Sequence, residues 1–379
     1  MMLSRSVYGG SVFNSPATHS QPALAENDTD KYKTKLTLEA VEFYKDQGSW
    51  DHVDMQVFGG DLINHRGVIN RANSELVITS IKNQPENNNI KLFGGSNLTV
   101  ANAKTYADSK ITYYAKYTDA YNKPIYGGSY LNGENTLHSG DSCLDFVKGW
   151  TSIASPNVFG GSYAAQTGAT HSGDSSVLIR IDSPTASSVI YGGSHLYAAG
   201  TTHSGKSNIT VSGGATYVQK NAFGGSLIEG YEAGKKSVHS GESSIVIKDG
   251  IATAANFTMF GGSDIKAQNG EHSGKSSIVV ENGYESGVQS VRCKGGVYGG
   301  SRGFTKIECV GRYEAPGGKF PSPKAPEGWM RGHIGSMYSF LDSVFTGRIP
   351  CPSFEDGYKV QVILDAAHRS FSEGKEIYL

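Results

Sequence analysis

Histidine recurs at one position of a repeated His-Ser-Gly motif, which begins at His138, His171, His203, His239 and His272. Imidazole titrates near neutral pH and is a common metal ligand, so a repeated histidine could form a pH-sensing or metal-binding column. Zinc, however, needs ligands that converge tetrahedrally, and a single file of side chains does not converge. The adjacent serine and glycine are typical of a turn. The pattern therefore favours turn residues that stack, stay mostly neutral near pH 7 and bind no metal tightly.

The residue after each His-Ser-Gly is charged, in the order Asp141, Asp174, Lys206, Glu242 and Lys275. If this position stacks, opposite charges in neighbouring repeats are worth about 0.2–1 kcal/mol per pair. Other acidic residues are scattered along the chain, whereas glycan cleavage needs paired carboxylates, so a glycan-cleaving enzyme is the least favoured class. We assign no catalytic, cofactor-binding or metal-ligating residue, and we expect no cofactor.

A second motif sets the period of the chain. It is an aromatic residue followed by two glycines, with first glycines at Gly9, Gly59, Gly94, Gly127, Gly160, Gly192, Gly224, Gly261 and Gly299. Successive first glycines are 50, 35, 33, 33, 32, 32, 37 and 38 residues apart. Recurrence at this length is typical of a solenoid or a propeller.

The content of one repeat indicates which solenoid. Short runs such as "SSVLIRI" and "SSIVI" follow His-Ser-Gly and alternate apolar with polar residues, which indicates strands. The aromatic segment predicts a second strand, and stretches such as "ATYVQKN" predict a third. Helical repeats are excluded because no window has helical spacing, and a propeller blade is longer, near 40–45 residues. We therefore predict an all-β fold, a parallel β-helix of about eight 32–38-residue repeats.

The aromatic and glycine positions have an architectural interpretation. In a parallel stack each side chain meets its own copy in the coils above and below. The residues Phe159, Tyr191, Phe223 and Phe260 would then form an offset-stacked ladder. The glycines would allow a sharp bend or a positive φ where a Cβ would clash in every coil. The alternative, a ligand groove opened by small residues, is less favoured.

Composition excludes several function classes. The chain has 379 residues, a net charge of −1 and 49 glycines, and its charged fraction of 18% carries no basic footprint for nucleic acid. No apolar run is long enough to span a bilayer or to serve as a secretory signal. The cysteines Cys143, Cys293, Cys309 and Cys351 share no repeat position, so a disulfide framework or zinc site is not expected.

The copies of "IYGGSHLYAAGTTHSGKSNITVSGG" resemble the glycine-rich repeats of bacterial cell-surface proteins, in particular the β-helical passenger regions of autotransporters and related adhesins. The resemblance covers about residues 7–301. It implies an elongated stalk outside the cell or on the bacterial surface, with a glycan or a host or cell-surface protein as its partner. The chain departs from this pattern because it shows neither a signal peptide nor an autotransporter barrel.

The C-terminal part of the chain has a different pattern. Six of the twelve prolines fall between Pro316 and Pro352. One helix is expected from the helical spacing of apolar residues that ends at Gly347. A second is expected after Ser353, with an apolar face, and a closing strand over "KEIYL". The apolar positions are Met337, Phe340, Leu341 and Val344 in the first helix, and Val360, Ile363, Leu364 and Ala367 in the second.

The segment "SFEDGYKVQVILDAAHRS" and its flanks, about residues 332–379, resemble the C-terminal end of the glucose–fructose oxidoreductase and inositol dehydrogenase family. Membership would imply a nicotinamide cofactor and a sugar or polyol substrate. The family's Gly-x-Gly-x-x-Gly turn, which lets the backbone approach the pyrophosphate, is missing, since no two glycines in the chain are separated by a single residue. No E-K-P stretch is present either, so no catalytic residue is carried over.

The domain organisation follows from these patterns. We predict a solenoid over residues 1–303, irregular before Gly127, a proline-rich connector over 304–331, and a two-helix tail over 332–379. The favoured function is a non-enzymatic bacterial cell-surface or secreted β-solenoid. The alternative is a truncated or fused relative of NAD(P)-dependent sugar or polyol oxidoreductases that lacks its Rossmann domain.

Overall fold

The computed structural model describes residues 2–3, 6–20, 34–39, 42–43, 54–79, 89–114, 124–147, 151–153, 157–180, 185–186, 189–212, 217–218, 221–248, 258–280, 296–303, 341, 343, 345–347, 353–375 and 377. The chain divides into two compact units, residues 1–306 and 307–379. The predicted connector, residues 304–331, lies outside the described residues.

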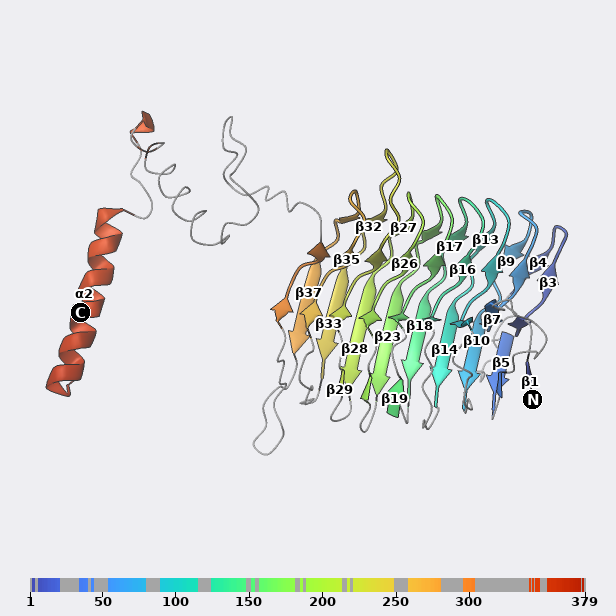
Figure 1. Ribbon diagram of the computed structural model, residues 1–379, viewed down its shortest axis with the longest axis horizontal. Helices are drawn as coiled ribbons and strands as arrows, with labels where there is room; N and C mark the ends of the chain where they lie inside the picture. Colours follow the sequence, from blue (N-terminus) through green and yellow to red (C-terminus); the bar gives the residue numbers. More distant parts are fainter. Residues whose placement is uncertain are drawn as a thin grey trace. The chain divides into compact units, whose positions relative to one another are not determined.

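The first unit is a parallel β-solenoid in which each repeat contributes one strand to each of four stacked sheets (Figure 1). Two of these sheets have nine strands and two have eight, and every strand pairs in parallel with the equivalent strands of the neighbouring repeats. The prediction of an all-β, parallel solenoid is therefore confirmed. We refer below to one such repeat as a coil.

The sheet that carries the aromatic residues, here called the aromatic sheet, contains β2 (Val7–Tyr8), β7 (Asp54–Phe58), β11 (Asn89–Phe93), β15 (Ile125–Tyr126), β20 (Val158–Phe159), β25 (Ile190–Tyr191), β30 (Ala222–Phe223), β34 (Met259–Phe260) and β38 (Val297–Tyr298). The corner sheet follows the Gly-Gly pair and contains β3 (Val12–Phe13), β8 (Leu62–Ile63), β12 (Asn97–Leu98), β16 (Tyr130–Leu131), β21 (Tyr163–Ala164), β26 (His195–Leu196), β31 (Leu227–Ile228), β35 (Asp264–Ile265) and β39 (Arg302–Gly303).

The histidine sheet contains β4 (Thr18–His19), β9 (Ile69–Asn70), β13 (Lys104–Thr105), β17 (Leu137–His138), β22 (Thr170–His171), β27 (Thr202–His203), β32 (Val238–His239) and β36 (Glu271–His272). The long-strand sheet contains β5 (Thr34–Leu38), β10 (Ser74–Ile78), β14 (Ser109–Tyr113), β18 (Ser142–Phe146), β23 (Ser175–Arg180), β28 (Ser207–Ser212), β33 (Ser243–Ile247) and β37 (Ser276–Val280).

Two smaller sheets complete the strand pairing. One joins β19 (Thr151–Ile153), β24 (Thr185–Ala186) and β29 (Tyr217–Val218), and the strand expected in "ATYVQKN" is β29. The other pairs β1 (Met2–Leu3) with β6 (Glu42–Phe43).

The alternating residues of the long strands fill the interior. Val177, Ile179, Ile209 and Ile245 are at most 1% exposed and pack with the first residues of the aromatic strands in one continuous cluster. Because strands in register place the same position one coil apart, β-branched residues lie on β-branched residues from β23 to β37. The described part of the solenoid contains strands and no helix. The burial of these apolar side chains is therefore its main source of stability.

The aromatic residues form the expected ladder. From Tyr8 to Tyr298 each ring stacks on the next with centroids 4.8–5.1 Å apart and planes within 12° of parallel. The rings of Phe58, Phe93 and Phe159 are fully buried. Strand spacing thus dictates the distance between rings, and the side chains adopt the offset stacking that the ring quadrupole favours.

The paired glycines are explained by close approach and not by positive φ. A Cβ on Gly59 would lie 2.5 Å from the carbonyl oxygen of Gly94 and 2.9 Å from the nitrogen of Leu76. Within the described part of the solenoid, positive φ occurs in the turn after the corner sheet instead, at Asn102, Asn135, Gly168, Gly200 and Gly234. The expectation of a positive φ at the Gly-Gly pair is therefore wrong, and the expected Cβ clash is what requires glycine there.

We expected irregular coils before Gly127, where His-Ser-Gly is missing. The described strands of this region nevertheless join the same four sheets, with β7, β8, β9 and β10 in register with their neighbours on both sides. The difference lies in the residues of the histidine sheet, where Asn70 and Thr105 stand at the histidine position. Hydrogen-bonding side chains other than histidine therefore permit the same path.

The second unit contains helix α2 (Phe354–Glu373), which begins directly after Ser353 and ends before Gly374, a residue with φ of 62°. Gly347 has φ of 68° after helical residues at 345 and 346, as expected for a helix C-terminus. The apolar side chains of Val360, Ile363 and Leu364 are 50–57% exposed, so the face predicted to be apolar is not buried within the described part of this unit. The predicted closing strand over residues 375–379 falls mostly outside the described residues.

Candidate functional site

The repeated histidines form a buried column, here called the histidine column. Their rings stack in sequence with centroids 4.7–4.8 Å apart. His171, His203 and His239 are 0% exposed and His138 is 1% exposed, whereas His272 at the C-terminal end is half-buried. Each histidine is the last residue of a two-residue strand and precedes the turn, so the column lies inside the solenoid wall.

Serine side chains hold each ring at its Nδ1 atom. The serine after the Gly-Gly pair lies nine residues before the histidine in four coils and thirteen in the other, and its Oγ is 2.7–2.8 Å from Nδ1. These serines are Ser129, Ser162, Ser194, Ser226 and Ser263. The same Oγ accepts the backbone N–H of the equivalent serine in the preceding coil at 3.0 Å. The column is therefore tied to the backbone at every coil.

The hydrogen-bond network determines the tautomer of the ring. Ser175 donates its hydroxyl hydrogen to the carbonyl oxygen of Gly192 at 2.7 Å, so it can only accept from His203 Nε2, 3.4 Å away. Nε2 must then carry the hydrogen, and Nδ1 accepts from the hydroxyl of Ser194 at 2.8 Å. The same arrangement recurs at His171 and His239, so these imidazoles are also neutral with the hydrogen on Nε2. At the two ends of the column the surroundings of Nε2 differ: that of His272 lies 3.0 Å from Ser276 Oγ, and that of His138 is buried with no hydrogen-bond partner among the described residues.

The surroundings keep the column uncharged. Burial lowers the pKa of His138 and His272 to about 4 and that of His203 to about 3. Burial also lowers the pKa of His171 and His239, and the neighbouring histidines lower both further because like charges would lie one strand spacing apart. A protonated ring would moreover direct a second hydrogen at a serine that already donates to it. The histidines thus act as neutral hydrogen-bonding side chains at pH 7.

Sequence reasoning identified the stacking of the histidines but missed their serine partners. The signal was available, because the serine of the Gly-Gly-Ser motif precedes histidine by nine residues in most repeats, and a second serine follows each histidine by four and approaches Nε2 of the histidine in the next coil. Turn chemistry was expected for the serine within His-Ser-Gly. The residues that bind the ring are instead the two serines outside that motif.

The charged position after His-Ser-Gly lies on the surface. The carboxylate of Asp141 accepts the backbone N–H of Asp174 at 3.0 Å, and that of Asp174 accepts the N–H of Lys206 at 2.8 Å. The expected pairing of opposite charges occurs between Lys206 and Glu242 at 3.4 Å. Both of these side chains are exposed, so the pair contributes little to stability.

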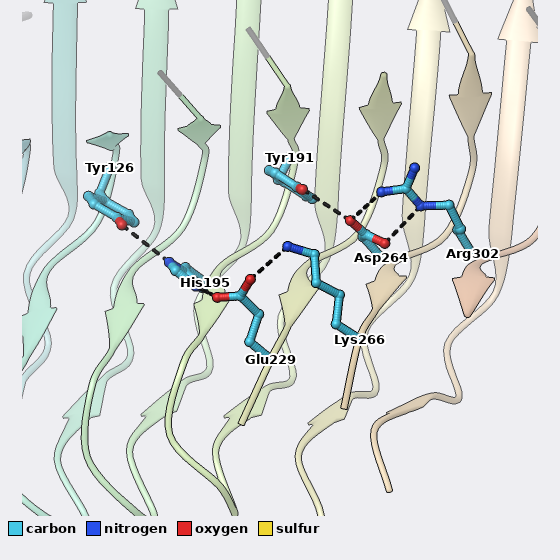
Figure 2. Close-up of polar contacts among 7 residues, drawn as sticks. All are labelled: Tyr126, Tyr191, His195, Glu229, Asp264, Lys266 and Arg302. Carbon is cyan, nitrogen blue, oxygen red and sulfur yellow. Dashed lines mark hydrogen bonds and ion pairs between the residues drawn. The ribbon is translucent and has the colours of Figure 1, made fainter. Parts of the chain in front are cut away.

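A second polar group, here called the corner cluster, lies where the aromatic and corner sheets meet (Figure 2). His195 Nε2 lies 2.7 Å from Glu229 Oε2, and Lys266 Nζ lies 2.7 Å from the other carboxylate oxygen. The Tyr126 hydroxyl is 3.3 Å from Nδ1 of the same imidazole. Hydrogen bonding by His195 and the nearby Lys266 lower the pKa of Glu229 to about 2. Burial lowers the pKa of His195, which is therefore neutral and donates to Glu229.

The other half of the corner cluster compensates a buried carboxylate. Asp264 is 0% exposed and receives two hydrogen bonds from the Arg302 guanidinium, at 2.9 and 2.7 Å, and a third from the Tyr191 hydroxyl at 3.2 Å (Figure 2). The guanidinium also lies over the Phe223 ring, 4.8 Å from its centroid. Burial and the neighbouring Asp264 raise the pKa of the Tyr191 hydroxyl, so it stays protonated and remains a donor.

The aromatic ladder and the corner sheet are matched across two coils. Wherever the ladder carries tyrosine within the stack, a polar residue of the corner sheet two coils further along meets its hydroxyl, in the pairs Tyr8 with Asn97, Tyr126 with His195 and Tyr191 with Asp264. Where the ladder carries Phe159, the corner sheet two coils on carries Leu227. Each of these three tyrosines therefore has a hydrogen-bond partner for its hydroxyl, and Phe159, which faces leucine, needs none.

The side chains at the centre of the corner cluster are occupied by contacts within the chain. Both nitrogens of the His195 ring are engaged, and the Tyr126 hydroxyl belongs to a side chain that is 1% exposed. Across the described ranges, no group of three or more His, Cys, Asp and Glu side chains is placed to hold a metal ion. In the same ranges, no helix combines the length and apolar character needed to span a bilayer. Cys143, the described cysteine, is a free thiol.

Comparison with known proteins identified no relatives. No family model matches the chain, and no curated protein or solved structure matches it at a significant level. What can be said of its class rests on the fold itself, which is a parallel β-solenoid compatible with a stalk-like repeat protein.

Proposed function

We propose that the chain is a non-enzymatic bacterial cell-surface or secreted β-solenoid, an adhesin- or passenger-like stalk. The observation that carries this proposal is that the repeated polar residues form hydrogen bonds with one another inside the solenoid. In the histidine column the histidines are neutral, and at His171, His203 and His239 both ring nitrogens are hydrogen-bonded to serines inside the wall. A general acid or base must instead reach its substrate with a free nitrogen or oxygen. The resemblance of the repeats to autotransporter passengers and adhesins adds the expected location.

The expected partner is a glycan or a host or cell-surface protein. Exposed tyrosines provide the side chains for such contacts, with Tyr106, Tyr114, Tyr197 and Tyr231 exposed by 43–55%. A tyrosine ring combines apolar area with a hydroxyl, which suits both sugar rings and polar protein surfaces. The solenoid would hold these rings at fixed positions, so that several weak contacts act together.

Binding is tested with the purified full chain on an array of bacterial and host glycans and on intact host cells. We expect saturable binding that falls at least about five-fold in a Tyr197→Ala, Tyr231→Ala double variant. A Lys206→Ala variant, which changes an exposed position of the turn, serves as the control and should bind like the wild type. Absence of saturable binding to every glycan and cell type would contradict the adhesive role.

Location is tested separately. Antibodies raised against the solenoid should label intact, unpermeabilised producing cells or precipitate the protein from their medium. Brief treatment of intact cells with protease should remove the labelling. Labelling that appears only after permeabilisation would contradict the surface or secreted location while leaving the scaffold role in place.

The alternative is a relative of NAD(P)-dependent sugar or polyol oxidoreductases. Only the sequence resemblance of residues 332–379 favours it. The cap residue and length of α2 agree with a helix that begins after Ser353. Fluorescence titration with NADH and NADPH tests this function, and we expect no saturable binding. Binding at micromolar cofactor, or turnover of any polyol, would support the oxidoreductase function against the stalk.

A further inference from the structure

We propose that the C-terminal end of the solenoid binds the N-terminal end of a second copy of this chain, in parallel and in register. The contact places β38 and β39 of one copy against β2 and β3 of the next. This inference concerns the ends of the stack and is independent of the proposed location and partner.

Both ends expose the surface that coils use to bind one another inside the chain. β2 and β38 are the outermost strands of the aromatic sheet, and β3 and β39 are those of the corner sheet (Figure 1). Every other strand of these two sheets pairs with a neighbour on both sides. A second copy in the same orientation therefore continues an interface that already recurs from coil to coil, whereas an edge left open is a template for pairing.

The backbone groups at the two ends are complementary. In the aromatic sheet, N–H groups bond the following coil, as Gly9 does to Phe58 at 2.9 Å and Gly10 to Gly60 at 3.1 Å. In the corner sheet the direction is reversed, as in Leu62 N–H to the Ser11 carbonyl at 2.9 Å. The C-terminal coil thus presents donors from one sheet and acceptors from the other, and the N-terminal coil presents the converse.

Four hydrogen bonds complete the pattern between copies. None of the groups involved has a backbone partner among the described residues. The bonds run from Gly299 N–H to the Tyr8 carbonyl, from Gly300 N–H to the Gly10 carbonyl, from Val12 N–H to the Ser301 carbonyl, and from Asn14 N–H to the Gly303 carbonyl.

The side chains at the ends are apolar and match in position. Val297 and Tyr298 are 54% and 53% exposed, and Val12 at the other end is 53% exposed. In the joined arrangement Tyr298 stacks on Tyr8 and extends the aromatic ladder, which elsewhere repeats every 4.8–5.1 Å. The joint thus buries apolar area that both isolated ends leave in water.

The glycines at the C-terminal end give independent evidence that the surface is open. A Cβ added to Gly299 or Gly300 would have no atom of a described residue within 4 Å. A Cβ at the equivalent Gly59 would lie 2.5 Å from the next coil. At the C-terminal end, the space that the next coil fills elsewhere in the stack therefore contains no described residue.

The joint covers only part of the cross-section. β36 and β37 end their sheets one coil before β38 and β39, so the second copy contacts the first through the aromatic and corner sheets only. Two pairs of two-residue strands bury much less than the roughly 1,200 Å² of a standard stable interface. We therefore expect reversible association at concentrations of about 0.1–1 mM, giving linear head-to-tail oligomers.

Sedimentation of the full chain across this concentration range tests the proposal. The wild type should shift from monomer to longer species, and Tyr298→Asp should raise the apparent dissociation constant at least about ten-fold by burying a charge in the joint. Tyr231→Asp is the matched control, because Tyr231 is 55% exposed but lies away from the ends. A wild type that stays monomeric at about 1 mM, or equal association of the two variants, would overturn the proposal.

Gly299→Ala separates the joint from folding. The added methyl group would have no atom of a described residue within 4 Å, so the unfolding midpoint should not change. In the joint it would strike the Gly9 carbonyl of the second copy, and association should be lost. Retained association would show that self-assembly, if observed, uses another surface.

Directed crosslinking tests orientation and register. In a background with the native cysteines replaced by serine, Val297→Cys and Val7→Cys occupy positions that pair in register, as Met259 and Val297 do within the chain. Mixing the two single variants under oxidation should give a disulfide-linked dimer, because in-register Cα atoms at strand spacing fall within disulfide range. Each variant alone should form no disulfide-linked dimer. Dimers from either single variant, or none from the mixture, would exclude the head-to-tail arrangement.

Discussion

The histidine column and the corner cluster both place neutral imidazoles in hydrogen-bond networks, yet they are built differently. In the column, His203 has the same kinds of partner as His171 and His239, namely two serines that recur in every coil. In the corner cluster, His195 has partners that occur once, Tyr126 and Glu229. A polar residue that stacks on its own copy in neighbouring coils needs hydrogen-bond partners that recur with the same period. A buried polar residue that does not recur needs particular hydrogen-bond partners one or two coils away.

The comparison first predicts that the repeated part tolerates no change of volume at its closest approaches. Gly205→Ala would place a Cβ against the Gly173 carbonyl oxygen and 2.9 Å from the Asp174 nitrogen, so we expect a loss of at least ~3 kcal/mol or failure to fold. Gly300→Ala, with no atom of a described residue within 4 Å, should leave the free energy of unfolding within ~0.5 kcal/mol. Denaturant unfolding followed by circular dichroism measures both. Equal effects would contradict the packing argument.

Acid should affect the column far more than the cluster. Folded His138 and His272 have pKa values of about 4 and folded His203 of about 3, whereas the unfolded value is near 6.5. Between these values the unfolded state binds more protons, so the free energy of unfolding falls as the pH decreases from about 6.5 to 4.

Each histidine contributes a slope of about 1.4 kcal/mol per pH unit in that window. His203→Thr places in the column the residue type found at Thr105, and its unfolding free energy should depend less steeply on pH by about one proton. Denaturant unfolding at pH 7, 6, 5 and 4 gives both slopes. Identical slopes for wild type and variant would show that this ring is protonated in the folded state.

Removing a partner within the corner cluster should cost an intermediate amount. Arg302→Leu leaves the Asp264 carboxylate buried with only the Tyr191 hydroxyl, and we expect a loss of about 2–4 kcal/mol. The value lies toward the low end because the Arg302 side chain is 28% exposed. The double variant Asp264→Leu, Arg302→Leu should recover most of it, since Leu227 occupies the same column one coil earlier. A double variant no more stable than Arg302→Leu would contradict the ion-pair argument.

The smallest effect concerns the match between ladder and corner sheet. Tyr126→Phe removes one hydroxyl and should cost about 1 kcal/mol. Phe159→Tyr adds a hydroxyl that would reach toward Leu227 without an acceptor, costing about 1–3 kcal/mol, and Leu227→Asn should relieve part of that loss. Thermal unfolding of the three variants measures this. An unchanged thermal stability of Phe159→Tyr would contradict the match between ladder residues and corner-sheet residues two coils further along.

In the C-terminal tail, the sequence predicted the bounds of helix α2 but not what surrounds it. Ser353 and Gly374 correctly bounded α2, because capping is decided by a few neighbouring residues. The spacing predicted an apolar face that includes Val360, Ile363 and Leu364, and these side chains are exposed in the described part of the unit. Spacing predicts which face is apolar and carries no information on what covers it.

By itself the sequence determined the parallel, in-register stack, its aromatic ladder and its column of histidines. Repetition at a nearly constant period brings each residue against its own copy, and only residues that tolerate their own copy at strand spacing can recur. The tertiary structure alone decided that close approach, and not positive φ, requires glycine at the Gly-Gly pair, and which residues meet in the corner cluster. Those contacts join positions 34 to 73 residues apart with no common spacing, because the distance along the chain between coils depends on loop lengths.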